Sequence, residues 1–319
     1  MKKILVTGAS GQIGSELIEE LRIQHGSKNV IGLDIKKTTN NKINNNFIIA
    51  DVTDKKEIKN VIDKYNFQTI YHLASILSVK GEDDPDQAWH VNINGLKNIL
   101  DVAKEHKMSI FWPSSIAVFG PKSPKRNAPQ MTVMDPNTIY GITKVSGELL
   151  CNYYFKKFGV DVRSIRYPGI ISYKTQPGGG TTDYAVEIFY QAITKNEYHC
   201  FVKANTRLPM MYMDDAIKAA IKIMNADQSK IIIRTSYNLM ATSFSVQELA
   251  NEIKKHISDF KCYYEPDSRQ EIADSWPETI DDSKAREDWN WKPTFDLSLI
   301  VSDMIQNISH RYSTDKNEN

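Results

Sequence analysis

The sequence predicts an α/β fold: a doubly wound parallel sheet followed by a smaller C-terminal region. Three observations predict it. Short apolar runs alternate with helical patterns through the first half of the chain, a glycine-rich turn joins the first run to the first helix, and the pattern becomes less regular after residue 168. We therefore divide the chain into residues 1–171, which carry the sheet, and residues 172–319, which interleave partly with them.

The expected elements follow from the spacing of apolar residues. KILVT at 3–7 is a short buried run, and the amphipathic stretch 12–24 that follows it has the period of a helix. Strands separated by helices pair in parallel, because each crossover returns the chain to the same edge of the sheet. The remaining expected strands are 30–34, 47–50, 69–74, 109–114 and 164–168, and the helices between them are 54–64 and 86–106.

Two polar stretches are expected to lie outside these elements. The asparagine-rich run 38–47 is interpreted as a solvated turn rather than a loop that binds a polar ligand. The last residues, 313–319, are expected to lack regular structure.

The composition argues against several classes of protein. The 319 residues carry a net charge of +1, with 25% charged and 10% aromatic residues, so neither a nucleic-acid binder nor a disordered chain is expected. No apolar run approaches the roughly 18 residues of a membrane span, and the apolar start at 4–6 is shorter than the core of a signal peptide. We expect a cytoplasmic protein without membrane contact.

The odd number and wide spacing of the cysteines argue against a disulfide framework or a zinc site: Cys151, Cys200 and Cys262.

A glycine-rich turn after the first expected strand predicts a dinucleotide site. Gly8 permits a tight turn, Gly11 lets the backbone approach a pyrophosphate, and Gly14 lets the helix pack closely on the strand. Asp34 ends the second expected strand about 20 residues beyond Gly14, where an acid binds the adenosine ribose hydroxyls and favours NAD over a 2′-phosphorylated cofactor. This combination predicts a Rossmann-type fold that binds NAD. Further residues expected at the cofactor are Gln12, Ile13, Ile35, Asp51, Val52, Leu73 and Ala74.

A tyrosine and a lysine at helical spacing predict an acid–base site. Tyr140 and Lys144 share one face of a helix, so the ammonium lies near the phenol. The spacing alone is weak, because Tyr153 and Lys157 repeat it further along the same helix, where we expect the aromatic side chains in the core and the lysines in solvent. Ser115 distinguishes the first pair, since it ends the fifth strand at the edge where open α/β sheets bind ligands.

The glycines, Ser115, Tyr140 and Lys144 together resemble an extended short-chain dehydrogenase/reductase, the branch that includes the nucleotide-sugar epimerases and dehydratases. Four further segments resemble one family of that branch, the L-threonine 3-dehydrogenases of the short-chain type. They are RYPGII at 166–171, PGGGTTDYAV at 177–186, TRLPMMYM at 206–213 and ADSWP at 273–277. The resemblance implies that L-threonine is oxidised by NAD at its hydroxyl carbon to 2-amino-3-oxobutyrate, a step of threonine catabolism.

The resemblance also implies the roles of the acid–base residues. Tyr140, as phenolate, removes the hydroxyl proton, Ser115 orients the same oxygen, and Lys144 holds the nicotinamide ribose and lowers the pKa of the tyrosine. A free tyrosine has a pKa near 10, so a base that works near pH 7 needs a shift of about 3 units, or roughly 4 kcal/mol. The ammonium and the positive nicotinamide ring in a low-dielectric site are expected to supply it. Ile170 is also expected at the cofactor, and no metal is expected.

The substrate carboxylate is expected at a second glycine-rich turn. Residues 177–183 lead into an apolar helical run, and the residues alone fit either a cradle at a helix N-terminus or a plain capped loop. The resemblance favours the cradle; it also favours Ser78 near the substrate and Trp276 above it, rather than a loop hydroxyl and ordinary packing. The substrate amine is assigned to Asp183 or to a main-chain carbonyl. The expected substrate-binding residues are Ser78, Ser115, Tyr140, Gly180, Thr181, Thr182, Asp183 and Trp276.

Two other functions stay open as alternatives. A nucleotide-sugar epimerase shares the fold and the three acid–base residues, but the diphosphate-binding asparagine of those epimerases is absent from RYPG at 166–169. A non-catalytic dinucleotide sensor binds NAD and a protein partner and turns over no small alcohol. A zinc-dependent alcohol dehydrogenase is not expected, because no Cys/His cluster is present.

Assembly and a few single residues complete the expectations. The resemblance implies a homodimer, through helices 86–106 and 138–158 packing against their symmetry mates, and leaves open whether the product passes to a CoA-dependent ligase. Arg207 is left open between a core ion pair and a ligand contact. His72 is expected to be a structural histidine with its hydrogen bonds satisfied.

Overall fold

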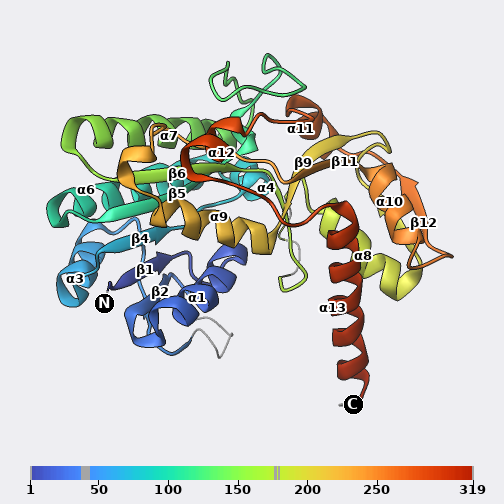
Figure 1. Cartoon of the computed structure of the whole chain (residues 1–319), viewed down its shortest axis with the longest axis horizontal. Helices are drawn as coiled ribbons and strands as arrows, with labels where there is room; N and C mark the ends of the chain where they lie inside the picture. Colours follow the sequence, from blue (N-terminus) through green and yellow to red (C-terminus); the bar gives the residue numbers. More distant parts are fainter. Residues whose placement is uncertain (1, 37–43, 176–177, 179, 318–319) are drawn as a thin grey trace.

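A seven-stranded parallel sheet forms the centre of the molecule (Figure 1). The computed structural model describes residues 2–36, 44–175, 178 and 180–317, the last four of these by their backbone alone. The strand order is β10-β6-β5-β4-β1-β2-β3, and every adjacent pair is parallel. This confirms the predicted Rossmann-type α/β fold. The strands are β1 (Ile4–Thr7), β2 (Val30–Asp34), β3 (Phe47–Ile49), β4 (Thr69–His72), β5 (Ser109–Ser115), β6 (Val162–Tyr167) and β10 (Tyr237–Asn238).

Helices cover both faces of the sheet, because its strands are apolar on both sides. In β1, Ile4 and Val6 pack in one core cluster, whereas Leu5 between them packs in another. The helices over the first cluster are α1 (Gln12–His25), α9 (Met213–Asn225) and α12 (Ser283–Trp289). The helices over the second are α3 (Lys55–Tyr65), α6 (Leu96–His106) and α7 (Ile139–Phe158).

The second half of the chain builds two small sheets at one end of the molecule (Figure 1). In the first, β9 (Arg207–Tyr212) lies between β7 (Gly169–Ile171) and β11 (Thr242–Ser245). In the second, β8 (Glu197–Cys200) pairs with β12 (Lys261–Tyr264). The helices that pack there around a third core cluster are α8 (Tyr184–Lys195), α10 (Val246–Lys254) and α13 (Leu297–Asn317), with α11 (Arg269–Ser275) beside them.

The same half also returns to the large sheet. Strand β10 pairs with β6, and helices α9 and α12 pack on the large sheet's face. The chain therefore crosses more than once between the large sheet and the smaller ones. The division at residue 171 stays a prediction.

Two expected elements differ from those observed. The helix expected over 86–106 consists of α5 (Pro85–Trp89), a π-helical segment at His90–Gly95 and α6. The expectation for the C-terminus was wrong as far as residue 317, since α13 continues to Asn317. Of the asparagine-rich stretch, residues 38–43 lie outside the described residues. None of the described helices is both long enough and apolar enough to cross a bilayer.

Candidate active site

At the glycine-rich turn, β1, α1 and the residues after β4 approach one another so closely that two of the positions have no room for a side chain. Gly8 has a φ of 67°, and a Cβ added there lies 2.5 Å from the Ala74 nitrogen. A Cβ on Gly14 lies 2.2 Å from the carbonyl oxygen of Gly8. Helix α1 begins after Gly11 without a side-chain cap, so its first N–H groups are available to an anion. The turn leaves room only because its glycines lack a Cβ, and it lies next to an uncapped helix N-terminus. Both features fit the pyrophosphate of NAD.

Asp34 is held beside this turn by two backbone hydrogen bonds. Its Oδ2 accepts from the Ser10 nitrogen at 2.9 Å, and its Oδ1 accepts from the Ile35 nitrogen at 2.8 Å. These contacts fix the carboxylate next to the glycine-rich turn at the end of β2. Its contact with the adenosine ribose stays a prediction.

A pocket of about 240 Å³ opens next to the turn, at the carboxyl ends of β1, β4 and β5. Most of the residues predicted for the site line it, although they come from both halves of the chain. From the first half these are Gly8, Gly11, Gln12, Ile13, Gly14, Leu73, Ser78, Ser115, Tyr140 and Lys144, and from the second Ile170, Gly180, Thr181, Thr182, Asp183 and Trp276. Five residues predicted at the cofactor lie outside its lining: Asp34, Ile35, Asp51, Val52 and Ala74.

Tyr140, Lys144 and Ser115 meet in this pocket. The Lys144 Nζ lies 5.4 Å from the centre of the Tyr140 ring and donates to the Pro113 carbonyl oxygen at 2.8 Å. The end of β5 therefore presents a carbonyl to the lysine and the Ser115 hydroxyl to the tyrosine. The second pair at the same spacing lies elsewhere. Its expected packing was wrong for Tyr153, which is 52% exposed on the outer face of α7.

Burial dominates the protonation of this pair. It raises the pKa of Tyr140 to about 12, although a hydrogen bond with Ser115 acts in the opposite direction. Burial also lowers the pKa of Lys144 to about 7. The residues of the pocket alone therefore do not produce the expected depression of the tyrosine pKa, because burial outweighs the Ser115 hydrogen bond and also weakens the tendency of Lys144 to carry a charge. The positive nicotinamide ring is the remaining expected source.

Helix α7 is fixed so that Tyr140 and Lys144 face the pocket. Thr138 caps its first turn by accepting from the Gly141 nitrogen at 3.1 Å, and Gly159, with a φ of 71°, ends it. One turn beyond Lys144, Glu148 is fully buried and accepts from the Ser114 hydroxyl at 2.7 Å. This bond ties the helix to the strand that carries Ser115.

Asn92 is a site-building residue that the sequence interpretation missed. It lies in the π-helical segment, and its Oδ1 accepts from the Ile76 nitrogen at 2.8 Å and the Ser75 hydroxyl at 3.0 Å. Its Nδ2 donates to Thr143 Oγ1 at 3.1 Å. Asn92 thus joins the loop after β4, which lines the pocket at Ser75, to helix α7. The sequence predicted one regular helix over 86–106, so the wider π-helical turn that orients the Asn92 side chain was not foreseen.

The second half of the chain closes the pocket with polar groups and one indole. Thr181 is 1% exposed, and its hydroxyl has no hydrogen-bond partner among the described residues. Asp183 accepts from the Gly180 nitrogen at 2.7 Å at the start of α8. Trp276 is buried, and Lys125 donates to its carbonyl oxygen at 3.2 Å and to that of Asp274. These contacts hold a hydroxyl, a turn and an aromatic wall next to Tyr140.

The contacts of Arg207 and His72 decide one question that the sequence left open and test one expectation. Arg207 forms an ion pair with Glu248 and donates to the Ser243 carbonyl oxygen, so it is a structural residue outside the pocket. The expectation for His72 was right for one nitrogen only. Its Nδ1 lies 2.7 Å from Thr7 Oγ1, but its buried Nε2 has no partner among the described residues.

Comparison with known proteins places the chain among the epimerases and dehydratases by two criteria, a family model and a similar sequence. The model of the NAD dependent epimerase/dehydratase family matches residues 4–239. An uncharacterised epimerase/dehydratase of Staphylococcus saprophyticus is 46% identical over 311 residues, which are 97% of each chain.

Two solved structures resemble the whole chain. An L-threonine dehydrogenase of Clostridium difficile is 49% identical with a TM-score of 0.95, over 98% of both chains. A protein described as a monomeric L-threonine 3-dehydrogenase, from a metagenome, is 48% identical with a TM-score of 0.93, over 97% of this chain and 99% of its own. The resemblance therefore includes both the sheet and the second half that closes the pocket.

Proposed function

Because the chain belongs to the NAD-dependent epimerase/dehydratase family, we propose that it oxidises L-threonine at C3 to 2-amino-3-oxobutyrate, with NAD as the hydride acceptor. One observation carries the proposal. The pocket joins Ser115, Tyr140 and Lys144 to the turn at 180–183 and to Trp276, which is the combination expected for a small amino-acid alcohol.

In the proposed mechanism, the protein removes one proton and orients one oxygen. The Tyr140 phenolate accepts the proton of the C3 hydroxyl, and the Ser115 hydroxyl donates a hydrogen bond to the same oxygen. When bound, NAD supplies the acceptor for the hydride that leaves C3. Lys144, as an ammonium, favours the phenolate and binds the ribose hydroxyls. The hydroxyl oxygen loses a proton and C3 loses a hydride, so the C3 alcohol becomes a ketone.

The second half of the chain is proposed to hold the amino-acid end of the substrate. The unpartnered hydroxyl of Thr181 and the turn before α8 receive the carboxylate, because a helix N-terminus favours an anion. Asp183 or a main-chain carbonyl receives the ammonium. Ser78 and Trp276 complete the walls and exclude water from the reacting carbon.

The direct test is NADH formation at 340 nm, with EDTA-treated protein, NAD and L-threonine. We expect strong activity that EDTA does not remove, with D-threonine and L-serine as poor substrates. No turnover by protein that still binds NAD contradicts the proposal. UDP-hexose turnover then indicates an epimerase, and NAD binding without any turnover indicates a sensor.

We further propose that two copies associate through α5, α6 and α7. Large apolar side chains are exposed on α5 and α7: Trp89 of α5 is 42% exposed, and on α7 Ile142 is 42%, Leu149 57% and Tyr153 52% exposed. Exposed apolar side chains on adjacent helices are typical of a homodimer surface. Sedimentation is expected to give a dimer for the wild type and a monomer for Leu149→Glu. A monomeric wild type contradicts this part, and the monomeric relative makes that measurement necessary.

The proposed product sets what must follow the reaction. 2-Amino-3-oxobutyrate is a β-keto acid, which loses carbon dioxide readily, so a CoA-dependent ligase that consumes it is the proposed next enzyme of threonine catabolism. Adding such a ligase and CoA to the assay is expected to divert the product from decarboxylation, so that the yield of carbon dioxide per NADH formed falls. An unchanged yield contradicts this role.

A further inference from the structure

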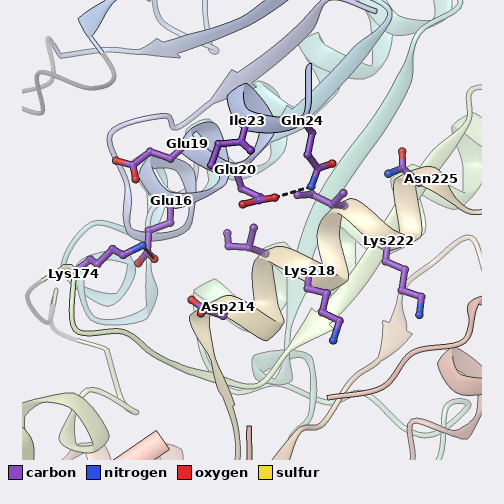
Figure 2. A pocket seen from close by; sticks show the side chains of 12 residues that line it. Glu16, Glu19, Glu20, Ile23, Gln24, Lys174, Asp214, Lys218, Lys222 and Asn225 are labelled. Atoms are coloured by element: carbon purple, nitrogen blue, oxygen red, sulfur yellow. Dashed lines mark hydrogen bonds and ion pairs between the residues drawn. The ribbon is translucent and has the colours of Figure 1, made fainter. Parts of the chain in front are cut away.

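A second groove, of about 630 Å³, runs between α1 and α9. Figure 2 shows Glu16 and Lys174 together at one end of it. The two lysines of α9 that line the groove have hydrogen-bond partners other than the α1 carboxylates. Lys218 donates to Thr294 Oγ1 at 2.8 Å, and Lys222 donates to the Asn290 carbonyl oxygen. Glu16 is the α1 carboxylate that reaches the chain segment after β7.

Glu16 is a buried carboxylate with two partners in that segment. Its side chain is 7% exposed. The Ser172 hydroxyl donates to Glu16 Oε1 at 2.6 Å, and the Lys174 ammonium lies 3.0 Å from Glu16 Oε2. Burial lowers the pKa of Lys174, but the Glu16 carboxylate, together with smaller effects of Tyr173 and Asp214, raises that pKa above its ordinary value. Charged hydrogen bonds of this kind are stronger than neutral ones.

The segment is also held from its other side. The Tyr173 carbonyl oxygen accepts from Arg311 Nη1 of α13 at 2.7 Å and from the Tyr190 hydroxyl of α8 at 2.9 Å. Within the segment, Ser172 Oγ accepts a hydrogen bond from the backbone nitrogen of Lys174 at 3.1 Å. Residues 172–174 are therefore fixed between α1 of the large sheet and two helices of the second half.

This segment connects the two parts of the active site. Glu16 lies at the start of the second turn of α1, two residues beyond Gly14 of the dinucleotide turn. Ser172 directly follows β7, whose Gly169 and Ile170 line the active-site pocket, and the chain then leads to the turn that carries Thr181. One side chain, that of Glu16, therefore links α1 to the segment that precedes the proposed carboxylate site.

We propose that Glu16 is a positioning residue, which ties the dinucleotide-binding helix to residues 172–174 and thereby sets the affinity for the amino-acid substrate once NAD is bound. The inference rests on the proposed function, because it identifies the pocket's second ligand as the amino acid. Glu16 itself lines the groove and not the active-site pocket, so it acts through Ser172 and Lys174.

Steady-state kinetics on four variants test the coupling. Glu16→Ala and Ser172→Ala are each expected to raise the KM for L-threonine about tenfold or more, which is the lower end of the effect that loss of a hydrogen bond to a charged group produces. The kcat and the Kd for NAD are expected to stay within about twofold. The double variant is expected to match Glu16→Ala alone, because the two groups act as a unit. Glu20→Gln on the same helix, whose partner is the exposed Gln24, is the control without effect.

A measurement without turnover separates this inference from the proposed function. Amide hydrogen exchange is followed in the peptide that contains residues 171–174, with and without NAD. NAD is expected to slow exchange there in the wild type and in Glu20→Gln, but not in Glu16→Ala. This result supports the coupling even if L-threonine is not the substrate. Equal slowing in Glu16→Ala overturns it, as does a KM that stays unchanged while the Kd for NAD rises, since Glu16 then only stabilises α1.

Discussion

The Glu148 carboxylate and the Arg166 guanidinium form an ion pair of 2.7 Å in which both side chains are closed to solvent. Glu148 lies on α7, one turn beyond Lys144, and Arg166 lies on β6. The guanidinium also donates to Asn238 Oδ1 at 2.9 Å and to the Gln130 carbonyl oxygen at 3.2 Å. The pair therefore joins the helix of the acid–base residues to strand β10 of the second half.

Loss of one partner of this pair is expected to cost stability. Glu148→Gln leaves a guanidinium charge buried without a counter-charge, which typically costs about 3–5 kcal/mol of unfolding free energy. Urea unfolding measures the change. Glu105→Gln removes an exposed ion pair with Lys59 and is expected to cost less than about 1 kcal/mol. Equal effects of the two substitutions contradict the importance of the buried pair.

Removal of the Tyr140 hydroxyl is expected to abolish proton transfer and to leave the cofactor site intact. For Tyr140→Phe we expect kcat to fall by about 10²–10⁴, the usual contribution of a general base, with the Kd for NAD within about threefold of the wild type. Tyr153→Phe is the matched control, because Tyr153 has the same spacing to a lysine but is exposed. Activity of Tyr140→Phe within a few-fold of the wild type rejects Tyr140 as the base.

The carboxylate at the end of β2 is expected to select the cofactor. Asp34→Ala removes the negative charge that opposes a 2′-phosphate, so we expect weaker NAD binding and a ratio of NAD to NADP affinity lowered at least about tenfold. Because Asp34 also accepts from the Ser10 nitrogen, Asp34→Asn is measured beside it to retain a hydrogen-bond acceptor. Titration of both cofactors by fluorescence gives the ratio, and an unchanged ratio removes Asp34 from the ribose site.

The fold and most of the pocket lining were predictable, because each rests on short-range rules. Gly8 and Gly14 occupy positions where a Cβ meets backbone atoms, so these glycines alone locate the turn. The order of apolar strands and helices then places Ser115 at the same sheet edge. Trp276 lies far along the chain, and its place in the pocket was predicted only from resemblance.

What the sequence did not predict depends on contacts between distant segments. Asn92 reaches Ile76 and Thr143 only because a π-helical segment interrupts the helix pattern. The burial of Lys144 and the partial burial of Tyr140, which oppose the expected lowering of the tyrosine pKa, arise from packing that no local pattern records. Tyr153 was expected in the core because it is aromatic, although the period of α7 points it outward.

His72 is expected to make the protein without cofactor less stable in mild acid. Burial, with the charge of Lys144 as a smaller cause, lowers its pKa to about 3, against an ordinary value of 6.5. Between these two values the unfolded chain binds a proton that the folded chain excludes, so stability falls as the pH decreases from 6.5 towards 3. The loss from this residue is about 2 kcal/mol between pH 7 and pH 5. Urea unfolding at pH 7 and pH 5 is expected to show a smaller pH effect for His72→Gln than for the wild type, while His90→Gln, at an exposed histidine, behaves as the wild type. An identical pH effect in His72→Gln means that His72 is accessible to protons in the folded protein.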